Sequence, residues 1–402
     1  MVSLGGSRAP DIATLRAETP GTSRLAHFNN AGASLVPRRV SDGVRRFLDA
    51  EETLGGYEAV EAHADLLERP YSACASLLNC GAEEIAVVQS ATQAWQQVFF
   101  GIEFQEGDRL ITSTAEYGSN YIAYLQAKKR HNISIEVVKE TPEGDLDLDH
   151  LRELAAGSKK PKLISISHIP TSSGRVYDAI GVGAIAKEFG IPYLLDACQS
   201  VGQMPVDVEE IGCDFLTATS RKYLRGPRGA GLLYISKHVL DSFEPMTLDV
   251  RGAKWSEREE FQMASDAKRF EQYEMSFAAK AGFGIAVEYA LEVGLDWCWE
   301  RIQFLSKKLR EGLSGIDKVQ VLDKGRVLCG IVSFCVDGMD PEVVKAALRQ
   351  QSINVSVSLI SSSRIDFENR NLKGVVRASV HYYNTEEEVE RLVQAVSELS
   401  MQ

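Results

Sequence analysis

The chain has 402 residues, of which 44% are hydrophobic and 25% are charged, a composition typical of a globular chain with a substantial core. Its 44 basic and 56 acidic residues leave a formal net charge of −12, so no basic field is available for nucleic acid or anionic lipid. The sequence contains no apolar run of about 18 residues and begins without a secretory signal pattern. We therefore expect a cytoplasmic protein that binds neither nucleic acid nor membranes.

The cysteines and the common nucleotide and hydrolase motifs exclude several further classes. Seven cysteines are scattered without a CxxC pair, so we expect small core residues rather than disulfides or a metal site: Cys74, Cys80, Cys198, Cys213, Cys298, Cys329 and Cys335. No P-loop, GxSxG or HExxH motif occurs. Residues 181–186 match GxGxxA, but the next acid at a strand end lies only 15 residues beyond Gly181, where a dinucleotide site needs roughly 20.

The first part of the chain predicts a large α/β domain. Residues 1–25 are polar and rich in glycine and proline, which favours an arm leading into the fold. Within the expected domain 26–265, short β-branched runs alternate with helical patterns. The predicted strands are 85–88, 109–112, 133–138, 162–166, 192–195, 214–218 and 229–235, and the predicted helices are 91–102, 119–130, 147–156 and 181–189. These seven strands should share one mainly parallel sheet.

The second part predicts a smaller α+β domain. A linker near 245–265 should lead into 266–402, which begins with a long helical region at 276–313. The strands expected here are 319–322, 327–336, 353–357 and 375–380, and the helices are 341–349 and 385–400. The fold class is therefore a large α/β domain plus a small α+β domain, to which the N-terminal segment contributes.

Three groups of polar residues stand at the ends of strands in the large domain. Asp196 closes one strand, Lys222 follows the next, and Ser90-Ala91-Thr92 lies between a strand and a helix. Because parallel strands end at the same edge of a sheet, these groups can meet there. Together they suit pyridoxal phosphate, which needs a lysine for its aldehyde, an acid for its ring nitrogen and an anion cradle for its phosphate.

Each of these residues, taken alone, also has a structural interpretation. Asp196 can cap a helix, Lys222 can be a solvated loop residue, and Ser90 can be an ordinary helix N-cap. Only their combination favours the cofactor.

The segment Asp196-Ala197-Cys198-Gln199 resembles a motif of the class V aminotransferase branch of fold-type I pyridoxal-phosphate enzymes. This group includes cysteine desulfurases, selenocysteine lyases and isopenicillin-N epimerase. The resemblance spans most of the chain, and it implies that Asp196 pairs with the pyridine nitrogen while Gln199 faces the ring hydroxyl. It further implies that Lys222 carries the cofactor and that Thr219 and Arg221 hold its phosphate.

The same resemblance assigns residues around the ring and the substrate. In Thr114-Ala115-Glu116-Tyr117-Gly118, the aromatic position that stacks on the ring is Tyr117, where desulfurases usually have histidine. His168 is implied to touch the ring or the substrate, although a structural histidine is an equal alternative. The implied substrate contacts are Asn30, Ala31, Gly32, Tyr57 and Arg377, and the guanidinium of Arg377 would bind an α-carboxylate.

Two departures from the family pattern limit this reading. Desulfurases carry a nucleophilic cysteine on a loop before the carboxylate-binding arginine, whereas residues 357–373 contain no cysteine. In addition, Glu274 stands where relatives have a threonine that reaches the partner subunit's phosphate. A carboxylate beside a phosphate repels it, which puts that contact in doubt.

Tyr117, the cysteine-free loop and the segment at 222–229 resemble hercynylcysteine sulfoxide lyases and isopenicillin-N epimerases more than desulfurases. This resemblance implies a C–S lyase that removes the α-proton of a cysteine conjugate or sulfoxide and releases pyruvate and ammonia. Lys222 would be the base, Asp196 would sustain the electron sink, and Tyr117 and His168 complete the expected catalytic set. Epimerisation or racemisation, transamination and a non-catalytic binding role remain as alternatives. The resemblance also implies a homodimer with a shared active site, in which Tyr57 and residues 269–274 lie near the partner's site.

Overall fold

Seven strands form one sheet in the computed structural model, which describes residues 10–401 and therefore leaves out the first nine residues of the expected arm. They are β2 (Ile85–Val88), β3 (Arg109–Ser113), β4 (Ser134–Val138), β5 (Leu163–Ser167), β6 (Tyr193–Asp196), β7 (Phe215–Thr219) and β8 (Gly231–Ile235). Their order is β2-β8-β7-β6-β5-β3-β4, and β8 is antiparallel to both of its neighbours. The predicted mainly parallel sheet of seven strands is confirmed.

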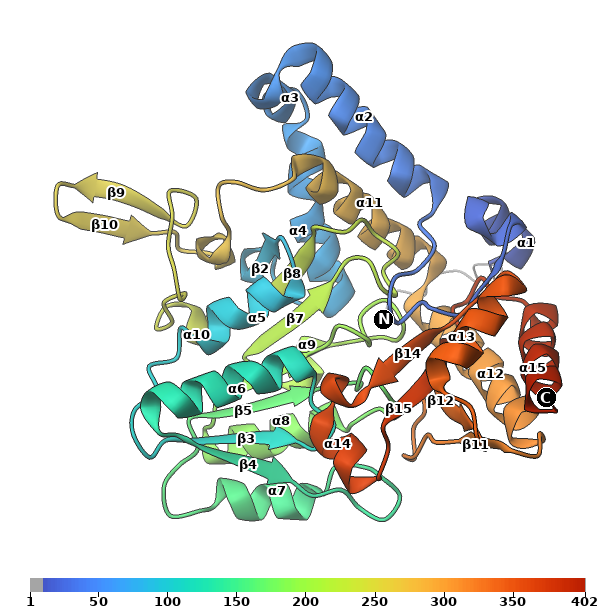
Figure 1. Cartoon of the computed structure of the whole chain (residues 1–402). Coiled ribbons are helices and arrows are strands. Elements are labelled where there is room, and N and C mark those ends of the chain that lie inside the picture. The colour runs from blue at the N-terminus through green and yellow to red at the C-terminus, as the bar shows by residue number, and fades with distance from the viewer. Residues whose placement is uncertain (1–9, 402) are drawn as a thin grey trace, which may run out of the picture.

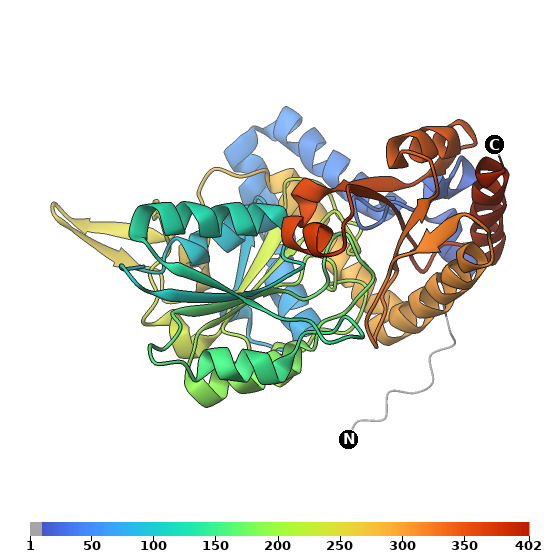
Figure 2. The ribbon, with the colours of Figure 1, turned by 60° about the horizontal axis from the view of Figure 1, so that its bottom comes forward.

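Helices cover both faces of this sheet because successive side chains of each strand point to opposite sides. In β6, Leu194 packs into a core with α5 (Ala91–Phe99) and α6 (Gly118–His131). Tyr193 and Leu195 pack into a second core with α7 (Leu148–Ala155) and α8 (Ala179–Phe189). Figure 2 shows α6 on one side of the sheet and α7 with α8 on the other. The continuous apolar runs of the sequence therefore reflect strands buried on both faces.

The direction of the strands decides where their loops meet. Strands β3 to β7 are parallel, and β2 runs in the same direction because β8 reverses between β2 and β7. The loops that follow these strands therefore leave the sheet at one edge, which is the usual ligand side of an open α/β sheet.

The smaller domain contains a four-stranded antiparallel sheet in the order β11-β12-β15-β14. Its strands are β11 (Val319–Val321), β12 (Ile331–Val336), β14 (Ser356–Leu359) and β15 (Gly374–Ser379). Its helices are α12 (Leu295–Ser314), α13 (Pro341–Gln350), α14 (Arg364–Asn369) and α15 (Glu386–Ser400), with a 3₁₀ turn at Ile360–Ser362. The predicted α+β domain is confirmed, and Figure 1 shows it beside the large sheet.

The long helical region is broken into two helices. The first, α11 (Phe277–Val293), packs on α4 (Ala64–Leu78) and on α2 (Arg38–Leu54). Gly294 then adopts a φ of +89°, which ends α11 and starts α12. A positive φ of this kind favours glycine.

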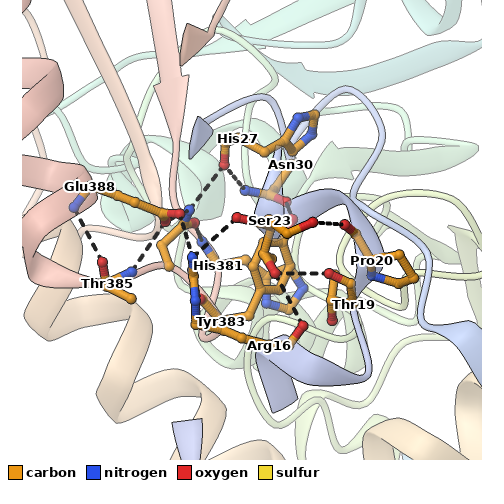
Figure 3. A network of polar contacts seen from close by, with 12 residues as sticks. Arg16, Thr19, Pro20, Ser23, His27, Asn30, His381, Tyr383, Thr385 and Glu388 are labelled. Carbon is orange, nitrogen blue, oxygen red and sulfur yellow. Dashed lines mark hydrogen bonds and ion pairs between the residues drawn. The ribbon is translucent and has the colours of Figure 1, made fainter. Parts of the chain in front are cut away.

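The N-terminal segment packs against the small domain. It contains α1 (Ile12–Ala17), a 3₁₀ turn at Pro20–Ser23 and β1 (Ala26–His27), which pairs in parallel with β13 (Ile353–Asn354). Arg16 forms an ion pair with Glu388 at 2.9 Å and donates a hydrogen bond to the Tyr383 carbonyl at 2.8 Å (Figure 3).

A β-hairpin occupies the stretch where a linker was expected. Strands β9 (Ala253–Glu257) and β10 (Glu260–Met263) pair antiparallel and project from the body of the molecule (Figure 1). Trp255 lies opposite Phe261, and such cross-strand aromatic pairs stabilise hairpins. The remaining short helices are α3 (Gly56–Ala62), α9 (Val208–Ile211) and α10 (Lys237–Leu240), with 3₁₀ turns at Ala82–Glu84 and Ala267–Phe270.

The GxGxxA stretch is a helix-packing motif. Gly183 lies inside α8, and a Cβ atom there would come within 1.7 Å of the Ile211 carbonyl oxygen. Its small size therefore serves the close approach of α8 to α9. Among residues 10–401, no helix is both long and apolar enough to cross a membrane.

Candidate active site

A pocket of about 230 Å³ opens at the edge where the parallel strands end. It brings together most of the residues that the sequence singled out for the cofactor: Ser90, Ala91, Thr92, Tyr117, Asp196, Gln199, Thr219, Arg221 and Lys222. A larger hollow of about 550 Å³, lined by Lys187, Lys237 and Glu84 among others, contains none of them. We therefore take the smaller pocket as the candidate active site.

One end of the pocket is built for an anion. The N-terminus of α5 lies there, and the Ser90 side chain caps it by accepting from the Gln93 N–H at 3.1 Å. Gly231 lies close beneath, because a Cβ atom on it would come within 3.0 Å of the Ala91 nitrogen. Free N–H groups at a helix N-terminus bind phosphate readily.

Two guanidinium groups reinforce this anion site. Arg221 and Arg228 both line the pocket, and within residues 10–401 neither forms an ion pair with a carboxylate. Arg221 donates to the Gly32 carbonyl at 2.6 Å. Burial lowers the pKa of Arg221, and the positive charge of Arg228 lowers it further. A dianionic phosphate would relieve this repulsion.

Asp196 is held at the end of β6 by two hydrogen bonds. One carboxylate oxygen accepts from the Cys198 N–H at 3.0 Å, and the other accepts from the Asn120 amide at 3.0 Å. Both oxygens keep a free lone pair, so the carboxylate can also accept a hydrogen bond from a ring N–H in the pocket.

Lys222 follows β7 and carries an amine without a hydrogen-bond partner among the described residues. Burial lowers the pKa of Lys222, and the positive charges of Arg221 and Arg377 act in the same direction, although Cys198 and Asp196 oppose them. A lysine with a lowered pKa is a better nucleophile and base near neutral pH.

Gln199 and Tyr117 flank the same space. The Gln199 amide nitrogen donates to the Ala31 carbonyl at 3.1 Å and to the Thr171 hydroxyl at 3.2 Å. Its amide oxygen is buried without a partner in the described chain. Such an oxygen can accept from a ligand hydroxyl. Tyr117, at the start of α6, contributes the aromatic side chain of the pocket.

Arg377 lies on β15 behind the pocket wall. Its guanidinium donates to the Thr171 carbonyl at 2.7 Å and to the Thr171 hydroxyl at 2.9 Å. Its Nε is buried without a partner among the described residues. Burial lowers the pKa of Arg377 to about 10. Arg377 is therefore a buried cation without a carboxylate partner, and an anionic group of the substrate could form an ion pair with it.

His168 does not reach this pocket, in contrast to the sequence prediction. Side chains alternate along a strand, so Ser167 faces the pocket while His168 points to the opposite side. The His168 ring lies 3.0 Å from the Ser200 hydroxyl, and burial lowers its pKa to about 4. Its position is that of a neutral structural histidine.

Asn30 and Tyr57 do not line the pocket of the single chain. Asn30 is fully buried, and its amide nitrogen donates to the Ser379 carbonyl at 2.7 Å. Its oxygen accepts from the Tyr383 hydroxyl at 2.5 Å, so Asn30 holds its loop in place (Figure 3). The backbone carbonyls of Ala31 and Gly32 in that loop meet Gln199 and Arg221. Tyr57 is 71% exposed on α3 and does not line the pocket within this chain.

The segment 269–274 lies beside the anion end of the pocket. The Arg269 guanidinium donates to backbone carbonyls, including that of Leu240 at 2.7 Å. Gln89, which lines the pocket, donates to the Glu274 carbonyl at 2.6 Å. The Glu274 side chain is exposed and free to face a second molecule.

Five polar residues at or behind the site were missed by sequence reasoning. Asn120, Ser167, Thr171 and Arg228 line the pocket, and Glu116 lies directly behind it. Arg228 and Thr171 could have been found from their positions in the sequence, because Arg228 follows β7 and Thr171 follows β5 in loops that leave the sheet at the ligand edge. Glu116 gave only a weak signal, since a buried glutamate cannot be told from a surface one in a single sequence.

The chain resembles known proteins over nearly its whole length. A probable cysteine desulfurase from Pyrococcus abyssi is 28% identical over 397 residues, which cover 96% of each chain. The apo structure of a cysteine desulfurase from Thermococcus onnurineus NA1 covers 99% of this chain and all of its own, with a TM-score of 0.90 and 26% identity. A cystine C–S lyase in complex with cysteine persulfide covers 94% of this chain and 99% of its own, with a TM-score of 0.83 and 20% identity, a likeness of fold.

This fold and this pocket define a fold-type I pyridoxal-phosphate enzyme. The family described as Aminotransferase class-V matches residues 26–392, and the chain belongs to this family. Its cofactor is pyridoxal 5′-phosphate, and its reaction is on an amino acid. The unpartnered Gln199 oxygen, the Gly231 cradle and the two unpaired arginines fit this cofactor.

Proposed function

We propose that the enzyme cleaves the C–S bond of a cysteine thioether or its sulfoxide by β-elimination. For a thioether the balance is R–S–CH₂–CH(NH₃⁺)–COO⁻ plus H₂O, giving RSH, pyruvate and NH₄⁺. For the sulfoxide, R–S(O)–CH₂–CH(NH₃⁺)–COO⁻ plus H₂O gives the sulfenic acid RSOH, pyruvate and NH₄⁺. The α-proton and the thiolate or sulfenate leave the substrate, and water later replaces the nitrogen. No external oxidant or reductant is needed.

The observation that carries this proposal concerns sulfur. Relatives of this chain are named cysteine desulfurases, yet residues 357–373 contain no cysteine that could accept the substrate's sulfur. The cysteine at the pocket is Cys198, and burial together with the charge of Asp196 raises the pKa of its thiol well above the ordinary value. A protonated thiol is a poor nucleophile, so the sulfur should leave with the product rather than stay on the protein.

The bound cofactor supplies an electron sink for the carbanion formed at the substrate's α-carbon. In this proposal Lys222 carries the cofactor and removes the α-proton, for which its lowered pKa is suited. Asp196 would keep the ring nitrogen protonated, Gln199 would accept from the ring hydroxyl, and Tyr117 would stack on the ring. Arg377 binds the α-carboxylate.

The phosphate would lie at the N-terminus of α5. The residues assigned to it are Ser90, Ala91, Thr92, Thr219 and Arg221, which all line the pocket. Phosphate binding at one end and carboxylate binding at the other would fix the orientation of the substrate over Lys222.

Epimerisation needs an acid on the face opposite Lys222. Of the expected catalytic set, Tyr117 and His168 are the two groups that could supply this acid, but His168 lies outside the pocket, which leaves Tyr117 alone. A phenol hydroxyl exchanges its proton poorly at neutral pH. Elimination needs no such second acid.

The test is an incubation with S-substituted cysteines and their sulfoxides, in which pyruvate, ammonia and the released thiol or sulfenic acid are measured together with optical rotation. We expect equal amounts of pyruvate and ammonia. Loss of optical rotation without pyruvate would instead identify an epimerase, and a protein-bound persulfide with alanine release would identify a desulfurase. Lys222→Ala is the control and should abolish both the visible absorbance of bound cofactor and the products.

We also propose that the enzyme is a cytoplasmic homodimer with a shared site. Large apolar side chains are exposed around the hairpin and the pocket's anion end, including Trp255 at 75%, Tyr57 at 71% and Tyr273 at 49%. Tyr57 and Tyr273 also interact with each other through their side chains. Light scattering should give twice the chain mass, and a fully active monomer would contradict the proposal.

A further inference from the structure

Glu116 is a buried carboxylate immediately behind the pocket, and it belongs to none of the roles described so far. It follows β3 and is only 2% exposed. One oxygen accepts from the Tyr117 N–H at 2.7 Å and from the Ser167 hydroxyl at 2.5 Å. The other accepts from the Ser167 N–H at 3.1 Å and the Thr112 hydroxyl at 3.2 Å. These donors come from β3, from β5 and from the N-terminus of α6.

A further donor connects Glu116 with the pocket. The Asn120 amide nitrogen lies 3.0 Å from a Glu116 oxygen and 3.0 Å from an Asp196 oxygen. Since an amide nitrogen carries two hydrogens, it can donate one to each carboxylate. Asn120 is 3% exposed, and its side chain therefore bridges two buried acids.

Neutral groups alone stabilise this carboxylate. Within the described chain, Glu116 forms no ion pair with lysine, arginine or histidine. The ionisable groups that face it are Asp196 on β6, Tyr124 on α6 and Tyr193 on β6. Burial and the nearby charge of Asp196 raise the pKa of Glu116, its hydrogen bonds lower it, and the net result is a pKa of about 7. A buried acid without a counterion is costly, and such acids concentrate at functional sites.

We propose that Glu116 is a positioning residue for Asp196, and that it acts through Asn120 by fixing the orientation of the carboxylate that meets the cofactor's ring nitrogen. The inference rests on the role that the proposed function gives to Asp196. Glu116 requires the NH₂ end of Asn120 to point toward it, so the same end also faces Asp196. The reverse orientation would place the Asn120 carbonyl oxygen against both carboxylates, which electrostatic repulsion disfavours.

The consequence for the cofactor is electrostatic. A hydrogen bond from Asn120 stabilises the ionised form of Asp196 and fixes one of its oxygens, which leaves the other face for the ring N–H. Without Glu116, Asn120 can rotate and Asp196 loses this bond. The basicity of Asp196 should then rise, and the ring nitrogen should experience a different charge in the resting enzyme.

The experiment compares the holoenzymes of Glu116→Gln and Asn120→Ala with wild type. Two signals are measured as a function of pH: the visible absorbance of the bound cofactor and the ¹⁵N chemical shift of its labelled ring nitrogen. We expect the midpoint of the absorbance change to move by about one pH unit in both variants, which corresponds to the loss of one hydrogen bond to a charged group. The ring nitrogen signal should move in the same two variants.

Thr112→Val is the matched control. It removes one hydrogen bond to the same carboxylate but leaves the Asn120 bridge intact, so it should lower stability without moving either signal. Equal shifts in Thr112→Val, or unchanged signals in Asn120→Ala, would overturn the proposal. If Asp196→Asn leaves the ring nitrogen signal unchanged, the role assigned to Asp196 fails as well, which separates the two outcomes.

Discussion

Arg175 and Arg377 are both buried arginines, but they differ in what faces them. Arg175 has a fully buried side chain between Glu140 and Asp366, to which it forms ion pairs. Arg377 is 6% exposed, and within the described residues its guanidinium bonds only to Thr171. Neighbouring charges raise the pKa of Arg175 despite its burial, whereas burial lowers that of Arg377.

The difference separates a structural cation from a binding cation. The charge of Arg175 is neutralised inside the fold, and its partners come from the end of β4 and from α14. It therefore ties the segment before β15 to the large domain. The charge of Arg377 has no internal counterion, so the free energy of neutralising it remains available for a ligand.

The largest effect is expected when Arg175, the cation with internal counterions, is removed. Arg175→Met leaves the partly buried Glu140 without an ion-pair partner and leaves the buried Asp366 with Arg370 alone, which should lower the free energy of unfolding by about 3 kcal/mol. Urea unfolding followed by circular dichroism measures this loss. Arg152→Met is the control, because Arg152 pairs with Glu188 on the surface, where both side chains are about half exposed, and should cost less than about 1 kcal/mol. An equal loss in both variants would contradict the comparison.

Removal of Arg377, the cation without a counterion, should lower activity and leave stability intact. Arg377→Met removes a buried charge without leaving an unpaired acid, so the free energy of unfolding should be equal to or higher than that of the wild type. The value of kcat/KM for the amino acid should fall at least about 100-fold, because a buried carboxylate pair contributes several kcal/mol to binding. A variant that is unstable but fully active would show that Arg377 is structural.

Glu116 adds a third case to the comparison of Arg175 with Arg377, because it is a buried acid whose hydrogen-bond partners are all neutral. Its pKa is raised from 4.5 to about 7, so the folded protein holds a proton that the unfolded chain has lost between these values. Stability from this group is present below the unfolded pKa and is lost as pH rises through 7. Relative to Glu116→Gln, the wild type should lose about 2–3 kcal/mol between pH 5 and pH 8 in urea unfolding. A pH-independent difference would place the folded pKa near its ordinary value.

The smallest effect is expected at Arg221, which has a carbonyl partner but no carboxylate partner among the described residues. Arg221→Gln should weaken the affinity for pyridoxal phosphate about tenfold, because Arg228 and the N-terminus of α5 still face the phosphate. Cofactor titration by absorbance measures the change. Loss of all binding would mean that Arg221 alone neutralises the phosphate.

Much of the fold and part of the site could be predicted from sequence. Strands β2 to β8 are short, mostly apolar runs, and the parallel order of β3 to β7 brings Asp196 and Lys222 to one edge by geometry alone. The failure at His168 has the same origin, since one step along a strand reverses the side a residue faces. Asn30 matched the pattern of a substrate-side loop, but its side chain faces the core. It is held there by Tyr383, which is 353 residues away in the sequence.

Other features had no local signal at all. The bridge from Glu116 to Asp196 depends on a contact between residues on different elements, which no spacing rule specifies. The hairpin β9–β10 was taken for a linker because its strands are exposed on both faces and therefore lack the alternation that marks a half-buried strand.

In the proposed homodimer, the exposed hairpin would make the assembly state of the enzyme measurable by proteolysis. An isolated two-stranded hairpin is only marginally stable in water, and the rings of Trp255 and Phe261 are 75% and 55% exposed in the single chain. Its turn carries Arg258, which is a site for trypsin. In a separated subunit the turn should be cut readily, whereas burial of the two rings against a second copy should slow the cut. The rate of cleavage at Arg258 therefore reports how much of the protein is paired at a given concentration.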